Sequence, residues 1–234
     1  MSAPRILMAG ESALTVEFGE TIDPSLSARV GALDAALAAA DLAGVVEAVP
    51  TYRSLSVHYD PDVISFEALA ERLRALAAHP GEAPSPRRWR APACYEPPFD
   101  EDAAEVAQML GFSREKVAAL HAGAVYRVYM YGFAPGYLFL GGLPPALAIS
   151  RRPTPRPPVP PGALLIAGGQ ALIAGVSMPT GWRMVGRTPC ALFDPARALM
   201  TQARIGDEIM FEPIDAARFE ALRARHIGLL PADG

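Results

Sequence analysis

The chain has few residues of the kinds that usually hold metals or form disulfides. It contains only two cysteines and four histidines among 234 residues. Cys94 and Cys190 lie far apart, and no H-x-H, H-E-x-x-H or paired-cysteine spacing occurs. The sequence therefore predicts neither a disulfide framework nor a metal site.

Long hydrophobic runs and an excess of positive charge are also missing. Arg, Asp or Glu interrupts every apolar stretch well before the roughly 20 residues that a membrane span needs. The formal net charge is −4, which gives no electrostatic footprint for nucleic acid. The first residues, MSAPRILMAGESAL, have no basic region followed by a long apolar core. We therefore expect a soluble, cytoplasmic protein that binds neither membranes nor nucleic acid.

Two common catalytic motifs are absent as well. No G-x-x-x-x-G-K-S/T loop is present, so any ATP must be bound by another device or by another subunit. No serine lies in a G-x-S-x-G elbow, which argues against a self-contained serine hydrolase.

A change in composition divides the chain into two predicted domains. The segment His79 to Arg88, HPGEAPSPRR, contains three prolines and a glycine, which cannot continue a helix and suit a linker. We place one domain at residues 1–82 and the other at residues 83–234. Both lengths fall within the usual range of single domains.

The first domain reads as a small α/β unit. Strands are predicted near residues 13–18, 45–49 and 55–59, with helices that start at Asp23-Pro24 and at Ser65. The order is β-α-β-β-α, and a last strand near Trp89 to Tyr95 would complete a ferredoxin-like βαββαβ pattern.

The second domain begins with two predicted short helices, at residues 100–110 and 113–122, and a final helix follows Asp215. Between them, short apolar runs alternate with Gly/Pro turns. Strands are expected at residues 125–130, 163–167, 171–176, 184–185, 191–193 and 208–211. This spacing is typical of a β-barrel or a closed sandwich, and the whole chain is predicted to be α+β.

Candidate binding residues follow a strand that breaks into a Gly-Pro-Gly turn, YRVYMYGFAPGYLFLGG. Gly132 and Gly136 allow backbone angles that side chains forbid, and the N–H groups of this loop could form an anion nest. Arg152 and Arg156 lie in a proline-rich, extended segment together with Arg151, and guanidinium groups bind carboxylates or phosphates bidentately. The alternative is that some of these arginines are solvated loop charges.

Four further residues are candidates with equally simple structural explanations. Gln170 follows two glycines, and its amide could orient an amide ligand, although hairpin geometry also explains the glycines. Arg187 and Thr188 lie at a turn that could face a pocket, but Thr188 could equally cap that turn. His121 could act as a general acid or base, or could be a helix C-terminal cation.

The order of these motifs resembles a known family. Gly10 to Leu14, Val49 to Pro61, GFAPGYLFLGGL, PR-x-x-VPPG, IAGGQ and GWRMVGRTP match, in order, the family that contains the B subunit of 5-oxoprolinase, allophanate hydrolase subunit 1 and the KipI-type kinase inhibitors. Ala174-Gly175 stands where the family pattern has a Tyr-Pro pair.

The resemblance implies a cyclophilin-like barrel for the second domain. It also implies a subunit that, with C-type and A-type companion subunits and ATP, opens the lactam 5-oxoproline to glutamate. Arg156 and Arg152 would then hold a carboxylate or phosphate, Gln170 and the Gly132 to Gly136 loop would orient the amide, and His121 would carry the proton. Two alternatives stay open: a KipI-type protein that binds a histidine kinase, and a subunit that acts on urea or allophanate.

Overall fold

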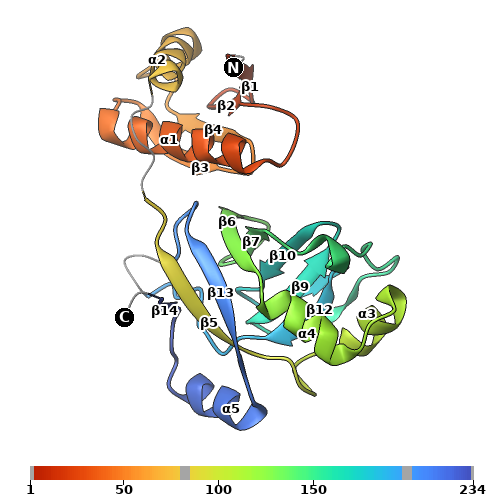
Figure 1. The fold of residues 1–234 in the computed structure, drawn as a ribbon. Helices are drawn as coiled ribbons and strands as arrows, with labels where there is room; N and C mark the ends of the chain where they lie inside the picture. The colour runs from red at the N-terminus through yellow and green to blue at the C-terminus, as the bar shows by residue number, and fades with distance from the viewer. Residues whose placement is uncertain (1–2, 80–84, 197–201, 233–234) are drawn as a thin grey trace. The chain divides into compact units, whose positions relative to one another are not determined.

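The computed structural model describes residues 3–79, 85–196 and 202–232 (Figure 1). The chain divides into two compact units, Met1–Ser85 and Pro86–Gly234. Each unit has an apolar core of its own. Residues 80–84 of the expected linker lie outside the described residues.

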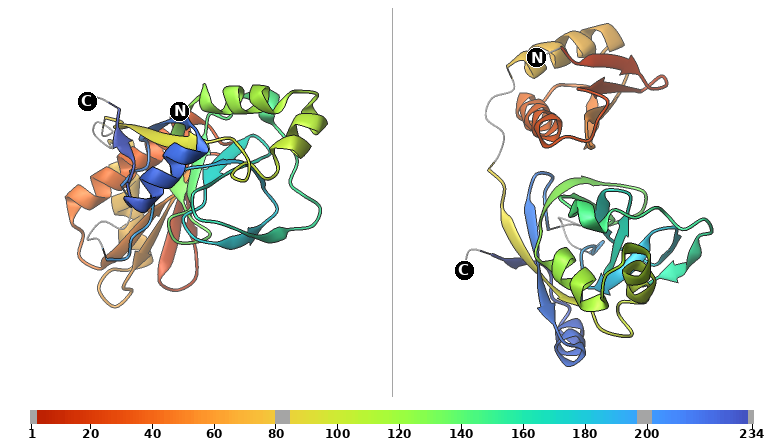
Figure 2. Two further views of the ribbon diagram at one scale, coloured as in Figure 1. Left: turned by 90° about the horizontal axis from the view of Figure 1, so that it is seen from below. Right: turned by 45° about the vertical axis from the view of Figure 1, so that its right-hand side comes forward.

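The first unit is an antiparallel sheet with two helices on one face, as the two views of Figure 2 also show. The strands pair in the order β1-β2-β4-β3. Its elements are β1 (Arg5–Met8), β2 (Ala13–Glu17), α1 (Pro24–Ala40), β3 (Val45–Pro50), β4 (Ser54–Tyr59) and α2 (Phe66–Ala78).

Local capping explains where its helices begin. The Asp23 side chain accepts a hydrogen bond from the N–H of Ser25 at 2.7 Å, and Pro24 occupies the first turn of α1. The Ser65 hydroxyl accepts a hydrogen bond from the N–H of Ala68 at 3.2 Å and so caps α2. Both starts agree with the sequence prediction.

The assignment of a last strand near residues 89–95 to the first unit is wrong. This strand, β5 (Arg88–Cys94), pairs in parallel with a strand of the second unit and buries Ala91 and Ala93 in the core of that unit. The sheet edge beside β2 is instead occupied by β1, which forms an antiparallel pair with β2. Alternate small residues in β5 suit the crowded interior of a barrel, and this explains its place.

The second unit is a closed barrel. Within the described residues, seven strands follow one another in the order β12-β9-β10-β7-β6-β13-β5, and the pairing of Arg187 with Cys94 joins β12 to β5. The other barrel strands are β6 (Val125–Tyr131), β7 (Leu138–Gly141), β9 (Ala163–Ala167), β10 (Gln170–Ile173), β12 (Arg183–Arg187) and β13 (Glu208–Ile214). The predicted α+β class with a closed barrel is confirmed.

Further elements surround the barrel. They are α3 (Ala103–Leu110), α4 (Arg114–Ala122), the 3-10 turn η1 (Pro145–Leu147), β8 (Arg156–Val159), β11 (Met178–Thr180), α5 (Ala216–Ala224) and β14 (Leu230–Pro231). In Figure 1, α5 follows the end of β13, and α3 and α4 lie together beside the barrel. No strand is formed at residues 191–193, where the sequence predicted one.

The barrel wall separates two apolar clusters. Inside, Leu164, Ile166 and Ile173 pack with Val106 and other residues of α3 and α4. Outside, a second cluster contains Leu165, Leu172 and Trp182 together with Tyr137 and Met184. Because side chains alternate along a strand, β9 and β10 contribute to both clusters.

The pair β8 and β11 forms a small sheet of its own. Among the helices described, none has the length and apolar character needed to cross a bilayer.

Candidate functional site

A cavity of about 330 Å³ belongs to the outer apolar cluster of the barrel. Three chain segments line it: the loop before β7, the segment that leads into β8, and the turn from β11 into β12. Its lining residues are Phe133, Tyr137, Phe139, Arg151, Pro155, Leu172, Pro179, Thr180, Gly181 and Trp182. We call it the aromatic cavity.

Tyr137 lines the aromatic cavity, and its hydroxyl has no hydrogen-bond partner among the described residues. The residue is 1% exposed, and its hydroxyl is buried without a hydrogen-bond partner among the described residues. Burial raises the pKa of the phenol above its ordinary value, so the hydroxyl keeps its proton at neutral pH. A buried hydroxyl without a partner is costly to a folded protein, and such groups call for an explanation.

Arg151 supplies a positive charge at the same cavity. Its guanidinium carbon lies 5.5 Å from the ring centre of Trp182, and the ring of Phe139 meets Trp182 edge to face at 5.9 Å. Arg151 is exposed and forms no ion pair within the described part of the chain. Aromatic walls, a phenol donor and a guanidinium can together hold a small planar ligand that carries a carbonyl and a carboxylate.

The Gly132 to Gly136 loop places two of these aromatic residues. The N–H of Ala134 donates to the carbonyl of Gly132 at 2.8 Å, and the N–H of Tyr137 donates to the carbonyl of Ala134 at 3.1 Å. Gly136 has a φ of 69°, and a side chain there would meet Phe193. The N–H of Gly132 also donates, to the carbonyl of Tyr137 at 3.3 Å, so two N–H groups of the loop already have partners. The anion nest predicted from the sequence remains a prediction.

Arg152 and Arg156, by contrast, lie in a network of carboxylates. Asp102 accepts hydrogen bonds from Arg152 at 2.9 Å and from Arg156 at 2.6 Å, and also from the N–H of Met184 at 2.7 Å. Arg152 also donates to Glu105 at 2.6 Å, and Arg156 contacts Glu101. We call these five residues, without Met184, the arginine–carboxylate network.

The network ties the start of α3 to the segments on either side of the aromatic cavity. Asp102 is largely buried, and its own N–H donates to the carbonyl of Met184 at 2.9 Å, so it docks α3 against β12. The anion-binding role predicted for Arg152 and Arg156 stays a prediction, but in this structure their charges are neutralised from within the chain.

His121 lies in the interior, on the last turn of α4. It is 1% exposed and packs against the rings of Tyr126 and Phe211, at 5.2 and 4.9 Å. Burial lowers the pKa of its imidazole to about 3, so the ring is neutral at physiological pH. Its Nδ1 pairs with the hydroxyl of Tyr95 at 2.9 Å. The proton-carrying role stays a prediction, and from this position His121 would act through Tyr95.

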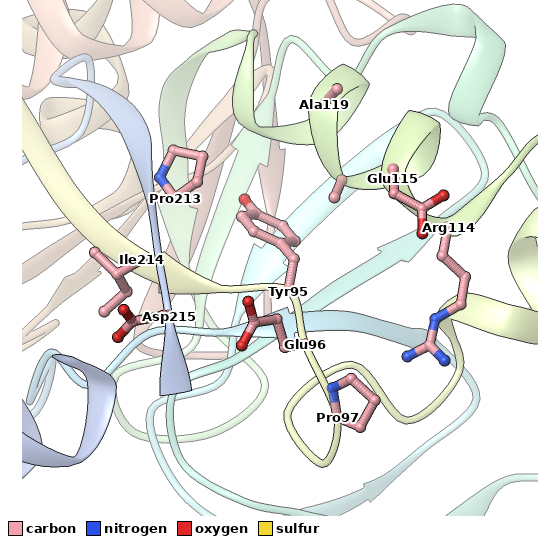
Figure 3. A pocket seen from close by; sticks show the side chains of 10 residues that line it. Tyr95, Glu96, Pro97, Arg114, Glu115, Ala119, Pro213, Ile214 and Asp215 are labelled. Carbon is pink, nitrogen blue, oxygen red and sulfur yellow. The ribbon is translucent and has the colours of Figure 1, made fainter. Parts of the chain in front are cut away.

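Tyr95 lines a second, larger cavity of about 670 Å³ (Figure 3). We call it the strand-end cavity, because it lies where β5 and β13 end. Figure 3 shows Tyr95 between α4, which contributes Glu115 and Ala119, and the end of β13, with Pro213. Its remaining lining residues are Glu96, Pro97, Arg114, Ala118, Ile214 and Asp215.

Each polar group of the strand-end cavity has a structural partner. Arg114 contacts Asp100, and Asp215 caps α5 by accepting from the N–H of Arg218 at 2.7 Å. Glu96 accepts from the N–H of Ala216 at 3.4 Å, and Glu115 bonds to Ser113 at the start of α4. No group of metal-ligating side chains occurs among the described residues, in this cavity or elsewhere.

The other predicted site residues are not among those that line the aromatic cavity. Gln170 starts β10 opposite Ala167, so Gly168 and Gly169 form the hairpin turn between them. Arg187 donates to the carbonyl of Pro161 at 3.0 Å and lies over Phe219. The hydroxyl of Thr188 accepts from the N–H of Cys190 at 3.2 Å, which is the capping arrangement considered from the sequence.

Two residues of the aromatic cavity were not selected from the sequence. Arg151 was part of the arginine-proline cluster, and Tyr137 was part of the Gly-Pro-Gly stretch, yet neither stood out from its neighbours. A sequence signal existed for the segment, but it did not distinguish Arg151 from Arg152.

The chain combines a closed barrel with an α/β unit, and comparison with known proteins shows which family has this combination. The family model "Carboxyltransferase domain, subdomain C and D" matches residues 4–202. The chain therefore belongs to this carboxyltransferase-domain family, and the family resemblance predicted from the sequence is confirmed.

Individual proteins that are similar to this chain show which members of the family it resembles. The B subunit of 5-oxoprolinase from Bacillus subtilis (strain 168) is 35% identical over 94% of this chain and 96% of the relative. The B subunit of 5-oxoprolinase from Escherichia coli O157:H7 is 32% identical over 91% of this chain and 97% of the relative. The crystal structure of TTHA0988 is 37% identical with a TM-score of 0.78, over 87% of this chain but only 40% of that longer one.

Proposed function

We propose that this chain is a subunit of a 5-oxoprolinase-type complex, which opens the lactam ring of 5-oxo-L-proline to L-glutamate and consumes ATP. The observation that carries the proposal is the end-to-end match with proteins named as the B subunit of 5-oxoprolinase, which covers 94% of this chain and 96% of the Bacillus relative. An isolated domain shared with a different kind of enzyme would match over only part of either chain.

The need for ATP follows from the chemistry of the lactam. Its amide is stabilised by resonance, and its nitrogen is a poor leaving group. Transfer of the γ-phosphoryl group to the lactam oxygen releases ADP and activates the carbon. Water then adds, the C–N bond breaks as the nitrogen takes a proton, and a second water hydrolyses the resulting acyl phosphate to glutamate and phosphate.

Companion subunits complete this proposal. The word subunit in the names of the relatives supports a hetero-oligomer, and we place the A-type and C-type subunits of 5-oxoprolinase beside this chain. This chain spans 40% of TTHA0988, so the same fold also occurs within a longer chain. ATP enters as a substrate of the complex, which supports a cytoplasmic location, and the chain alone is expected to be inactive.

The site residues predicted from the sequence belong to this proposal as hypotheses. Arg152, Arg156, Gln170, Arg187 and Thr188 would hold substrate or anion groups, the Gly132 and Gly136 loop would orient the amide, and His121 would move a proton. Arg156 is also a partner of Asp102 at 2.6 Å, so its loss would disturb both binding and folding.

The test is reconstitution of the complex from co-expressed subunits, with ATP-dependent glutamate formation from 5-oxo-L-proline as the readout. We expect turnover only when this chain is present, and we expect Arg156→Ala to abolish it. Arg88→Ala is the matched control, because Arg88 forms an exposed pair with Glu208 in the same unit. Turnover without this chain would refute the proposal, and a stable complex that makes no glutamate would point to a different amide substrate.

A further inference from the structure

We propose that this chain itself holds the ligand of the reaction, in the aromatic cavity, with Tyr137 as donor to the lactam carbonyl and Arg151 as partner of the carboxylate. The ligand class is a compact five-membered cyclic amide that carries a carboxylate. The choice of ligand rests on the proposed function. The choice of place rests on the structure alone.

The first argument is the state of the Tyr137 hydroxyl. It is buried and has no partner among the described residues, and Tyr137 belongs both to the outer apolar cluster and to the lining of the aromatic cavity. A lactam carbonyl oxygen that enters the cavity would accept a hydrogen bond from this hydroxyl. Binding would then satisfy a donor that the unliganded chain leaves unpaired, and this adds to affinity.

The second argument is the contrast between neighbouring arginines. Arg152 is bonded to Asp102 and Glu105, whereas Arg151 has no carboxylate partner within the described chain. Its guanidinium instead lies over Trp182, at the wall of the aromatic cavity. A cation–π contact of this kind does not use the N–H groups of the guanidinium, so a carboxylate can bind it without displacing an internal carboxylate partner.

The third argument is the shape of the cavity. A volume of about 330 Å³ lies at the small end of ligand-binding pockets, which suits a single ring better than a nucleotide. Phe139 and Trp182 supply flat apolar walls, and Phe133 packs edge to face on Tyr137 at 5.7 Å. A planar ring therefore finds aromatic walls beside it, with Tyr137 and Arg151 among the same lining residues.

The experiment compares three ligands by calorimetry, with the chain alone and with the reconstituted complex. 5-Oxo-L-proline has both polar groups, L-proline lacks the lactam carbonyl, and 2-pyrrolidone lacks the carboxylate. The wild type should bind 5-oxo-L-proline most tightly. Tyr137→Phe should weaken its binding about fivefold and leave L-proline unchanged, because one neutral hydrogen bond is lost. Arg151→Gln should weaken it more than tenfold and leave 2-pyrrolidone unchanged.

Stability gives a readout that separates binding from folding. Tyr137→Phe removes an unpaired buried hydroxyl, so the melting temperature should stay the same or rise. Arg152→Gln serves as the matched control for Arg151→Gln: it should lower the melting temperature, because it leaves Asp102 and Glu105 with fewer partners.

The two proposals can fail separately. If glutamate formation needs this chain but Tyr137→Phe and Arg151→Gln bind all three ligands as the wild type does, the assignment of the aromatic cavity is wrong and the proposed function stands. If the complex makes no glutamate while the variants still discriminate among the three ligands as expected, the assignment holds and the proposed function falls. Equal weakening of all three ligands by either variant also overturns the assignment.

Discussion

The two cavities of the barrel unit differ in whether their polar groups already have hydrogen-bond or ion-pair partners within the protein. The strand-end cavity is about twice the size of the aromatic cavity, at about 670 against 330 Å³. Yet its carboxylates cap helices, its arginine contacts Asp100, and its tyrosine hydroxyl is bonded to His121. In the smaller cavity, the Tyr137 hydroxyl is unpaired and Arg151 has no carboxylate partner within the described residues.

On the proposed assignment of the aromatic cavity, volume is a poor guide to the binding site in this fold. A ligand that enters the strand-end cavity must compete with hydrogen bonds that already hold α4 and α5. A ligand in the aromatic cavity would not have to displace a hydrogen bond of the Tyr137 hydroxyl or a carboxylate partner of Arg151 within the described residues. The same contrast separates Arg151 from the arginine–carboxylate network next to it.

The largest expected effect concerns that network. Asp102→Ala leaves Arg152, Arg156 and the N–H of Met184 without their shared partner, and should lower the free energy of unfolding by about 3 kcal/mol or more. Glu101→Ala is the control, because Glu101 also contacts Arg156 but is 46% exposed, and it should cost less than about 1 kcal/mol. Trp89 and Trp182 both lie in the second unit, so tryptophan fluorescence in denaturant follows that unit.

If Asp102→Ala and Glu101→Ala lower the free energy of unfolding by equally small amounts, the difference between the paired arginines and Arg151 is not supported. The network would then not be structural, and its arginines would be available to bind an anionic ligand as the sequence suggested.

The second effect concerns the residue behind the strand-end cavity. His121 has a folded pKa of about 3, below the ordinary value of 6.5, so the unfolded chain binds a proton there that the folded chain does not. Its contribution to stability should fall by about 1.4 kcal/mol for each unit that the pH drops between these two values. The variant His121→Gln should lose stability less steeply over this range.

His58→Gln is the control for that measurement, because His58 lies exposed on β4 of the other unit. It should keep the acid sensitivity of the wild type. If His121→Gln keeps it too, the imidazole is protonated more readily in the fold than its burial implies, and a role in proton transfer at the strand-end cavity gains support.

A third, smaller effect tests the loop of the aromatic cavity. Gly136→Ala places a side chain against Phe193 at a φ of 69°, whereas Gly168→Ala has a similar φ of 60° and open space around it. The Gly168 variant should cost about 1 kcal/mol for the backbone angle alone. The Gly136 variant should cost roughly 2 kcal/mol more because of overpacking, and should also weaken ligand binding. Similar losses in both variants would show that the loop adjusts without strain.

The smallest expected effect is on ligand affinity when a residue of the strand-end cavity is changed. Glu115→Gln alters the strand-end cavity and should leave the affinity for 5-oxo-L-proline within about twofold of the wild type, because Glu115 is not among the residues that line the aromatic cavity. Calorimetry beside Tyr137→Phe checks this. If Glu115→Gln weakens binding as much as Tyr137→Phe does, the ligand occupies the strand-end cavity instead.

The helices were largely predictable because their signals are local. The caps at Asp23, Ser65, Ser113 and Asp215 and the left-handed Gly111 all involve contacts within four residues along the chain. Strand partners were less predictable. β5 has the pattern of a strand, but its partner β13 lies more than a hundred residues away, and the sequence offered the first unit as an equally good host.

For the candidate site, the sequence located the segments but did not single out the side chains that we propose to bind the ligand. The motifs around residues 132–137, 151–156 and 180–182 do border one cavity. Among the arginines, however, the predicted Arg152 and Arg156 are paired internally, and Arg151 lines the cavity.

Hydrophobic period, caps and turn residues were sufficient for the α+β class and for a β-barrel or closed sandwich. The choice of the barrel and the carboxyltransferase-domain family came from the resemblance carried by the ordered motifs. All of these signals lie in short stretches of chain. Whether an individual polar group has a hydrogen-bond or ion-pair partner depends on residues that are far away in the sequence. Arg152 and Asp102 are separated by 50 positions in the sequence, yet their side chains meet at 2.9 Å. Folding brought that carboxylate to Arg152 and placed Arg151 and Tyr137 in the lining of one cavity, because each contact depends on elements that only the tertiary structure brings together.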